Sequence, residues 1–274
     1  MDTYIHFIDV GFGSMVLIRT STVNIIYDCN ITDENEGGIV RYLRRVIGLG
    51  TPIDIFICSH RDADHMRGIN RLHASNPIST IFDSGVVGTD PDCDEYKDYM
   101  DLRRNLGYKE IKARTYETYG DTKFRYMNSG WADYSDPNEQ SIVLKLEHNA
   151  GSSCLLGGDT NYRPWKEKIL THYGKKDVKC DIFLAPHHGS LDFFDDPADT
   201  QHYYLDHIKM ISPAMTLISV GPSVHGLPAK KAVELYTKYS TGSNQGNKVF
   251  TTEEKGNMRL VLKDSGGWEL HGQQ

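Results

Sequence analysis

The sequence has no basic excess, no paired cysteine motif and no long apolar run, and each absence narrows the class of protein. Its 274 residues include 30 lysines and arginines against 37 aspartates and glutamates, which gives a formal net charge of −7. The counts of charged residues therefore give no indication of a basic surface that binds nucleic acid. No uninterrupted apolar run approaches the roughly 20 residues that cross a bilayer. We therefore expect no membrane association.

Cysteine usage indicates a reduced protein rather than a disulfide framework. The five cysteines are odd in number, widely separated and form no C-x-x-C pair. Three of them lie inside apolar runs, where a reduced cysteine behaves as a small hydrophobic side chain. The first residues, MDTYIHFIDVG, lack the basic start and the long apolar segment of a signal peptide. We expect a strand there and a cytoplasmic location.

Short apolar runs that alternate with amphipathic segments predict an α/β fold. In the first half, strands are expected at residues 4–10, 14–20, 23–29, 53–59 and 79–85. In the second half they are expected within SIVLKLEHN, SSCLLGGD, CDIFLAPHH and AMTLISVG. Two α/β halves in a single domain, residues 1–274, are the simplest architecture.

Residues 86–137 interrupt this pattern. They are rich in Asp, Tyr, Lys and Gly and carry little continuous apolar patterning, apart from an expected helix around CDEYKDYMDLRRNLGY. The end of the segment clusters Gly, Asp, Pro and Asn, which is typical of a loop. We therefore expect an insertion or cap within the single domain.

The segment ICSHRDADHMRG (57–68) places two histidines and two aspartates in six positions directly after an apolar run. These residues are His60, Asp62, Asp64 and His65. Such side chains at the end of a buried strand would repel one another, or lose much of their hydration energy, unless a positive charge lay among them. Residues 60 and 62 can point the same way in an extended segment, and residues 64 and 65 reach a second direction as a helix begins. One loop therefore suits two metal ions.

Further candidate ligands follow three other predicted strands. Asp159 follows a Gly-Gly pair, His187 and His188 follow CDIFLAP, and His225 follows AMTLISVGPSV. Strand ends that meet at one rim are where sheet-based enzymes collect functional side chains. Two cations a few ångströms apart can generate hydroxide at neutral pH and stabilise both the attacking and the leaving oxygen of a phosphoryl group. Asp159 could bridge two such ions.

Structural explanations compete for some of these residues. Asp159 could cap the helix expected near Tyr162, and His225 could be a turn histidine bonded to the backbone. The pair His187 and His188 could include one histidine that only supports the site. The sequence leaves open which of the two is a ligand.

The order of these motifs resembles the metallo-β-lactamase superfamily, and most closely the hydrolase domain of ComEC-type competence proteins. The resemblance spans residues 4 to about 228, is interrupted by residues 86–137, and is most specific at HRDADH and PHHGS. It implies an αββα sandwich with metal ions at one edge of the two sheets. The membrane channel of ComEC-type proteins has no counterpart in these residues.

The resemblance also implies a ligand set. The implied metal ligands are His60, Asp62, Asp64, His65, Asp159, His187 and His225, with Asp159 as the bridge. Asp62 replaces the second histidine of the commoner superfamily pattern, which shifts the metal preference from zinc toward manganese or magnesium, with manganese the first choice and zinc the second. The sequence VHGLP around His225 departs from the family's usual Gly-His-Pro. Near the start of the chain, Phe12 and Ser14 occupy positions where the family usually has Gln and Asp.

The function that follows is phosphodiester hydrolysis with two divalent ions, Mn²⁺ or Zn²⁺, and with DNA as the expected substrate. In this hypothesis a metal-bridged hydroxide attacks phosphorus at a site that includes Asp64 and Asp159. His188 or His225 protonates the leaving oxygen, while the Gly189 amide and Ser190 hold a phosphate oxygen.

Two rival functions stay open at this point. A small-molecule phosphodiesterase, acting on phosphocholine or cyclic nucleotide esters, is favoured by the acidic charge, because a long polyanion usually needs a basic track. A catalytically inactive binding module is the second rival. The oligomeric state is not predicted.

Overall fold

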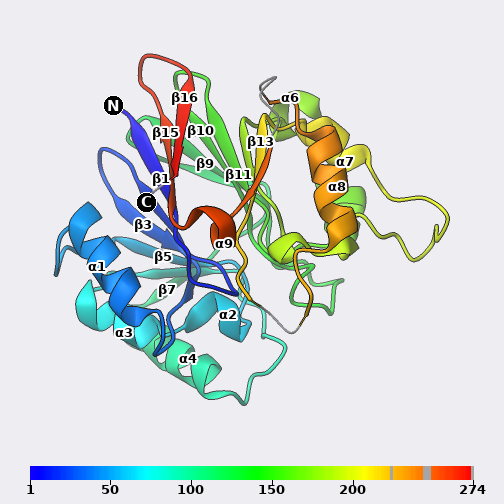
Figure 1. The fold of residues 1–274 in the computed structure, drawn as a ribbon. Coiled ribbons are helices and arrows are strands. Elements are labelled where there is room, and N and C mark those ends of the chain that lie inside the picture. Colours follow the sequence, from blue (N-terminus) through cyan, green and yellow to red (C-terminus); the bar gives the residue numbers. More distant parts are fainter. Residues whose placement is uncertain (223–224, 243–247, 273–274) are drawn as a thin grey trace.

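Two mixed β-sheets pack face to face, with helices on their outer sides (Figure 1). The structure is a computed structural model that describes residues 1–222, 225–242 and 248–272. In spatial order, the first sheet contains β16 (Trp268–Gly272), β15 (Met258–Leu262), β1 (Thr3–Phe7), β2 (Val16–Arg19), β3 (Asn24–Tyr27), β5 (Ile55–Cys58), β6 (Ile81–Asp83) and β7 (Tyr108–Glu110). The second contains β14 (Val249–Thr251), β13 (Met215–Ile218), β12 (Ile182–Leu184), β11 (Ser153–Leu156), β10 (Val143–His148), β9 (Thr122–Asn128) and β8 (Thr115–Tyr119).

Helices cover the outer face of each sheet (Figure 1). Beside the first sheet lie α1 (Glu36–Val46), α2 (Ala63–Met66), α3 (Ile69–Ser75) and α4 (Asp94–Leu106), with the short β4 (Cys29–Asn30) next to α2. The second half adds α5 (Tyr162–Pro164), η1 (Trp165–Ile169), α6 (Lys175–Val178), η2 (His187–Gly189), η3 (Leu191–Phe193), α7 (Asp206–Ile211), α8 (Lys230–Tyr239) and α9 (Thr252–Lys255). The predicted αββα sandwich is confirmed. None of the helices in the described ranges is long and apolar enough to cross a membrane.

Burial of both faces of the strands explains why their sequences are short, continuous apolar runs. In β5, Ile55 and Ile57 face the cluster between the two sheets, whereas Phe56 and Cys58 face the cluster beneath the helices. Parallel strands with both faces covered are apolar at every position rather than at alternate ones. The same double burial applies to β11 and β12, whose residues are all buried.

The strand directions bring distant loops to one edge of the sandwich. Strands β3, β5, β6 and β7 are mutually parallel in the first sheet, and β11, β12, β13 and β14 are mutually parallel in the second. The carboxyl ends of parallel neighbours lie at the same edge of their sheet. The loops after β5, β11, β12 and β13 carry the histidines and aspartates singled out in the sequence.

The structure differs from the expected cap over residues 86–137. Most of that segment belongs to the sandwich itself: α4 packs in the core beneath the first sheet, β7 pairs with β6, and β8 and β9 extend the second sheet. Its apolar pattern is weak because β7 is exposed throughout and β8 is largely exposed, as edge strands often are. The loops on either side of this part, around residues 84–93 and 129–141, border the candidate site.

A buried ion-pair network connects α4 to the loop after β5. The Asp83 carboxylate, fully buried at the end of β6, accepts hydrogen bonds from the guanidinium groups of Arg61 and Arg103 and from the Tyr99 hydroxyl. Burial raises the pKa of Asp83, but Arg61 and Arg103 outweigh this effect and lower it below its usual value. Arg61 lies between His60 and Asp62 in sequence, so the network holds the backbone that carries these side chains.

Replacing Asp83 by Ala should destabilise the protein strongly. The variant leaves two buried guanidinium groups without their counter-charge, and breaking a buried ion pair in this way costs about 3–5 kcal/mol. Urea unfolding at neutral pH measures the change. The matched control is Asp101→Ala, which removes an ion pair between half-exposed side chains on α4 and should change the free energy of unfolding by about 1 kcal/mol or less. Equal losses in both variants would contradict the assigned role of Asp83.

Candidate metal centre

A cavity of about 360 Å³ lies where the carboxyl ends of β5, β11, β12 and β13 meet. Acidic and imidazole groups dominate its wall, and two neutral polar side chains, one aromatic and one aliphatic side chain complete it. The lining residues are Phe12, Asp62, Asp64, Asn138, Asp159, His187, His188, Ser190, His225 and Leu227. Predicted site residues from the loops after β5, β11, β12 and β13 therefore meet at one cavity, together with Phe12 and Asn138 from two further segments.

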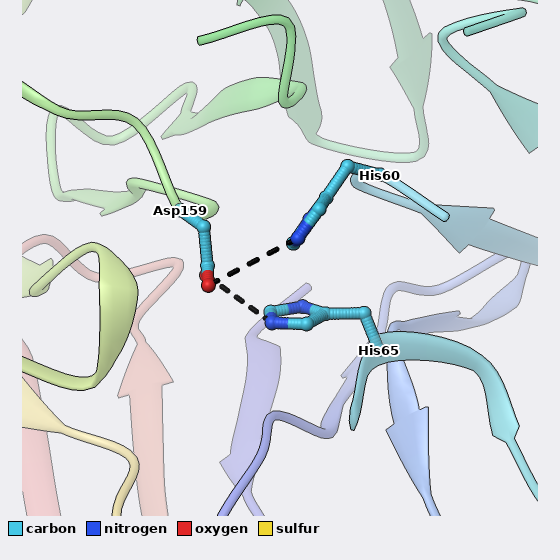
Figure 2. Close-up of side chains that lie close together, drawn as sticks. All are labelled: His60, His65 and Asp159. Atoms are coloured by element: carbon cyan, nitrogen blue, oxygen red, sulfur yellow. Dashed lines mark ion pairs between the residues drawn. The ribbon is translucent and has the colours of Figure 1, made fainter. Parts of the chain in front are cut away.

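One cluster of possible ligands joins the loop after β5 to the loop after β11. His60, His65 and Asp159 are buried, and one donor atom from each lies within 4.8 Å of the other two. Asp159 Oδ1 lies 3.2 Å from His65 Nε2, and Asp159 Oδ2 lies 4.0 Å from His60 Nε2. Figure 2 shows the two imidazole rings and the carboxylate pointing toward one another.

A second cluster shares His65 with the first. Donor atoms of Asp64, His65 and His188 also lie within 4.8 Å of one another. His188 Nε2 is 3.0 Å from Asp64 Oδ2 and 3.6 Å from Asp159 Oδ2. Asp159 and His65 thus lie between two sets of donors, in the central position that the sequence assigned to Asp159.

The donor set fits a divalent cation. His65 Nε2 is buried and has no hydrogen-bond partner among the described residues, although it lies beside Asp159. Leaving such a nitrogen unsatisfied is unfavourable unless something binds to it. A mixture of imidazole nitrogens and carboxylate oxygens is typical of sites for zinc, manganese and iron.

The protonation states also show that the cluster requires a positive charge. Burial disfavours charge on His65, but Asp159, Asp28 and Asp64 outweigh this effect and raise its pKa well above its usual value. Burial likewise raises the pKa of Asp159, but His65 and His188 bring it well below its usual range. In His60 burial dominates and lowers the pKa, which favours the neutral imidazole that metals bind.

Asp28 supports the cluster from behind, and the sequence analysis did not single it out. Its buried carboxylate lies 2.8 Å from His65 Nδ1 and accepts hydrogen bonds from the amide and hydroxyl groups of Ser59. A carboxylate at one ring nitrogen directs the other nitrogen toward a metal and makes it more basic. The available signal was an aspartate directly after the apolar run NIIY, held at φ 58°.

Asp62 lies at the outer side of the first cluster. Its Oδ2 is 3.7 Å from His60 Nε2, and both carboxylate oxygens accept hydrogen bonds from Thr89, at 2.7 Å from the amide and 2.8 Å from the hydroxyl. Gly88 packs so closely that a Cβ there would lie 1.9 Å from the Arg61 carbonyl oxygen. The loop around residues 84–93 thus fixes the orientation of Asp62.

The structure separates the roles of His187 and His188, which the sequence left open. His188 is buried, contacts Asp64, and has its Nδ1 2.9 Å from the Ser219 carbonyl oxygen. His187 lies outside both clusters, and its Nδ1 is 2.9 Å from Asp192 Oδ2. Burial lowers the pKa of His187, but the bond to Asp192 and the charges of Asp159 and Asp192 together outweigh this and raise the pKa to about 9. His188 is therefore better placed as a ligand than His187, whereas the family resemblance implies His187.

The remaining predicted residues divide into two groups. His225 and Ser190 line the cavity, although His225 is exposed and belongs to neither donor cluster among the described residues. Gly189 does not line the cavity, and its amide donates to the Pro186 carbonyl at 3.1 Å. The prediction that this amide holds a phosphate oxygen is not supported, because the turn already uses its hydrogen.

Comparison with solved structures identifies the fold. YhfI from Bacillus subtilis, a metallo-β-lactamase fold protein, matches 99% of this chain and 100% of its own with a TM-score of 0.55 and 13% identity. Igni18, a metallo hydrolase from Ignicoccus hospitalis KIN4/I, matches 100% of both chains with a TM-score of 0.54 and 12% identity. CmlA, a diiron β-hydroxylase from Streptomyces venezuelae, matches 95% of this chain and 54% of its own with a TM-score of 0.57 and 10% identity. The chain has the metallo-β-lactamase fold.

Sequence comparison agrees with the resemblance of the motifs to competence proteins. The chain is 24% identical over 182 residues to competence protein ComA from Neisseria gonorrhoeae, a match that covers 66% of this chain. It covers only 23% of the competence protein, so the chain corresponds to a part of that relative. No sequence-family model matches the chain.

Replacing Asp28 by Asn should weaken metal binding while preserving the fold. Asn also tolerates the positive φ at this position but carries no charge to hold His65. Loss of such a supporting group typically lowers metal affinity about 10- to 100-fold. Competition with a fluorescent chelator measures the affinity for Mn²⁺ and Zn²⁺. Asp33→Asn, at a largely exposed carboxylate outside the site, serves as the control, and unchanged affinity in Asp28→Asn would disprove its supporting role.

Alanine variants of the two neighbouring histidines should behave differently. His188→Ala removes a cluster donor and should lower metal affinity by more than about 100-fold, beyond the effect typical of a supporting residue. His187→Ala removes a ring that pairs with Asp192 and should retain the metal. Metal content after dialysis, measured by mass spectrometry, distinguishes the two. Metal loss from His187→Ala with retention in His188→Ala would reverse the assignment.

Proposed function

We propose that this protein is a metal-dependent phosphodiester hydrolase, and that its substrate is DNA. The observation that carries the proposal is the pair of donor clusters that share His65 beside Asp159. The metallo-β-lactamase fold and the similarity to a competence protein support it. The ComEC-type resemblance of the motifs implies the DNA substrate.

In this proposal five side chains hold two divalent ions, with manganese preferred. They are His60, Asp64, His65, Asp159 and His188, and Asp62 adds a carboxylate at the side of His60. Ions held there would supply hydroxide at neutral pH and stabilise the charge that develops on the phosphoryl oxygens. No side chain needs to act as a covalent nucleophile.

The chain's own groups would orient the substrate and move protons. Ser190 and Asn138 line the cavity and offer hydrogen bonds to phosphate oxygens. His187, held by Asp192 and with its pKa raised to about 9, is protonated at neutral pH. We assign to it the proton that the leaving oxygen takes up, since His188 is committed to Asp64 and the Ser219 carbonyl.

A small phosphodiester is the second candidate substrate. No lysine or arginine is among the described residues that line the cavity, so a polyanion would find no cationic track there. Binding of a long nucleic acid strand usually depends on several such contacts with phosphates. A nucleotide ester would need only the ions and the cavity wall.

The decisive experiment compares two substrates on protein loaded with Mn²⁺. One is an end-labelled single-stranded oligothymidylate, and the other is the p-nitrophenyl ester of thymidine 5′-phosphate. We expect hydrolysis of both by the native protein, and a loss of more than about 100-fold in kcat/KM for Asp159→Asn, beyond that typical of a supporting residue. Asp33→Asn, outside the site, should retain full activity.

The outcomes separate the candidates. Hydrolysis of the ester without cleavage of the oligonucleotide would replace the nuclease by the small-molecule phosphodiesterase. Hydrolysis of neither substrate by protein that binds Mn²⁺ would contradict phosphodiester hydrolysis altogether. Equal rates in the native protein and Asp159→Asn would contradict the assigned centre.

A further inference from the structure

Two apolar side chains of the cavity wall have no role in the proposed hydrolysis. They are Phe12 and Leu227, and they contrast with the carboxylates and imidazoles of the metal centre. The Phe12 ring lies 4.7 Å from the His188 ring and 5.5 Å from the His225 ring, measured between centroids. It therefore borders the position where a substrate must sit to reach the metal ligands.

Phe12 is presented by a turn that is fixed on several sides. Its two glycine neighbours, Gly11 and Gly13, both have positive φ, at 74° and 122°. A Cβ at Gly13 would lie 2.8 Å from the Asp64 carbonyl oxygen, so the turn rests directly on the ligand loop. A Cβ at Gly221 would lie 2.5 Å from Gly11 Cα, so the turn is also confined from the other sheet.

Hydrogen bonds hold the same turn at its carbonyl groups. Asn30 donates its side-chain amide to the Phe12 carbonyl, and the Ser219 hydroxyl donates to the Gly13 carbonyl at 2.8 Å. The backbone thus sets where the Phe12 ring is placed. A ring needed only for the core would be buried, as Phe7 and Phe56 are, whereas Phe12 stays partly exposed in the cavity.

An apolar ring beside a charged centre can bind a flat nucleobase of the substrate. Aromatic side chains bind nucleobases by stacking, and this recognition needs neither cations nor a particular base. With no lysine or arginine in the described wall, stacking is a mode of recognition that these residues provide.

We propose that Phe12 is the stacking platform for a nucleobase next to the phosphodiester that is cleaved. The inference rests on the proposed function and specifies its substrate class: nucleotide esters rather than alkyl esters such as phosphocholine compounds. Phe12 binds the base, and the metal ligands act on the phosphate. The base could belong to a polynucleotide or to a single nucleotide, and the test distinguishes the two.

The test measures selectivity for the base in two matched substrate pairs. The first pair is oligothymidylate and the same oligonucleotide with abasic tetrahydrofuran residues at its centre. The second is the p-nitrophenyl ester of thymidine 5′-phosphate and methyl p-nitrophenyl phosphate, which share a leaving group. Each is assayed with Mn²⁺-loaded native protein, Phe12→Leu and Phe12→Tyr. Tyr116→Leu, at a ring 63% exposed on β8, is the matched control.

We expect the native protein to prefer the base-bearing member of at least one pair. Phe12→Leu should lower that preference about 5- to 150-fold, the range that loss of a stacking side chain gives per base, chiefly through KM. Phe12→Tyr and Tyr116→Leu should keep it. Selectivity in the first pair identifies a polynucleotide, and selectivity in the second alone identifies a single nucleotide.

Two results would overturn the inference while leaving the proposed function intact. One is a native protein that hydrolyses both members of each pair equally, a result that needs no variant to fold. The other is a Phe12→Leu protein, folded by circular dichroism and loaded with metal, that keeps the native preference. If the native protein hydrolyses none of the substrates, the proposed function itself fails, and the inference fails with it.

Discussion

A concentration of carboxylates and imidazoles in a small, mostly buried volume is the constraint on which the structure around the site depends. His60, His65 and His188 meet Asp64 and Asp159 at the carboxyl ends of strands from both sheets. Buried carboxylates are stable only with a positive partner, and a proton on His65 or a divalent cation can provide that charge. The αββα arrangement is what allows two separate sheets to contribute to one such cluster.

The groups behind the cluster show how the fold keeps it in place. Asp28 orients His65, and Thr89 donates hydrogen bonds to both carboxylate oxygens of Asp62. Arg61, which precedes Asp62 in the loop after β5, is held by the Asp83 network. These contacts come from separate positions in the chain, and α4 contributes to the Asp83 network through Arg103. Positions far apart in the chain thus fix side chains that must stay within a few ångströms of one another, as ligands of a metal site require.

Much of the fold and of the donor set was predictable, because both leave local patterns. Doubly buried strands give apolar runs, and polar residues at strand ends meet at one edge, which located His60, His65 and Asp159 from sequence alone. Which of His187 and His188 is better placed as a ligand was not predictable. Both have positive φ in one turn, and only the tertiary contacts with Asp192 and Asp64 distinguish them. The strands β7 and β8 within residues 86–137 were not predicted for a related reason: they lie at sheet edges, where exposure removes the apolar pattern.

Anomalous diffraction from crystals soaked in Mn²⁺ would test the central claim most directly, namely that the shared donor clusters are a metal centre. The account predicts anomalous density in direct contact with the Asp159 carboxylate, with His65 and His188 coordinating through Nε2. Two peaks would match the proposed pair of ions. Crystals with no peak at Asp159, or with manganese bound only elsewhere on the molecule, would contradict the assignment of the site and the hydrolysis derived from it.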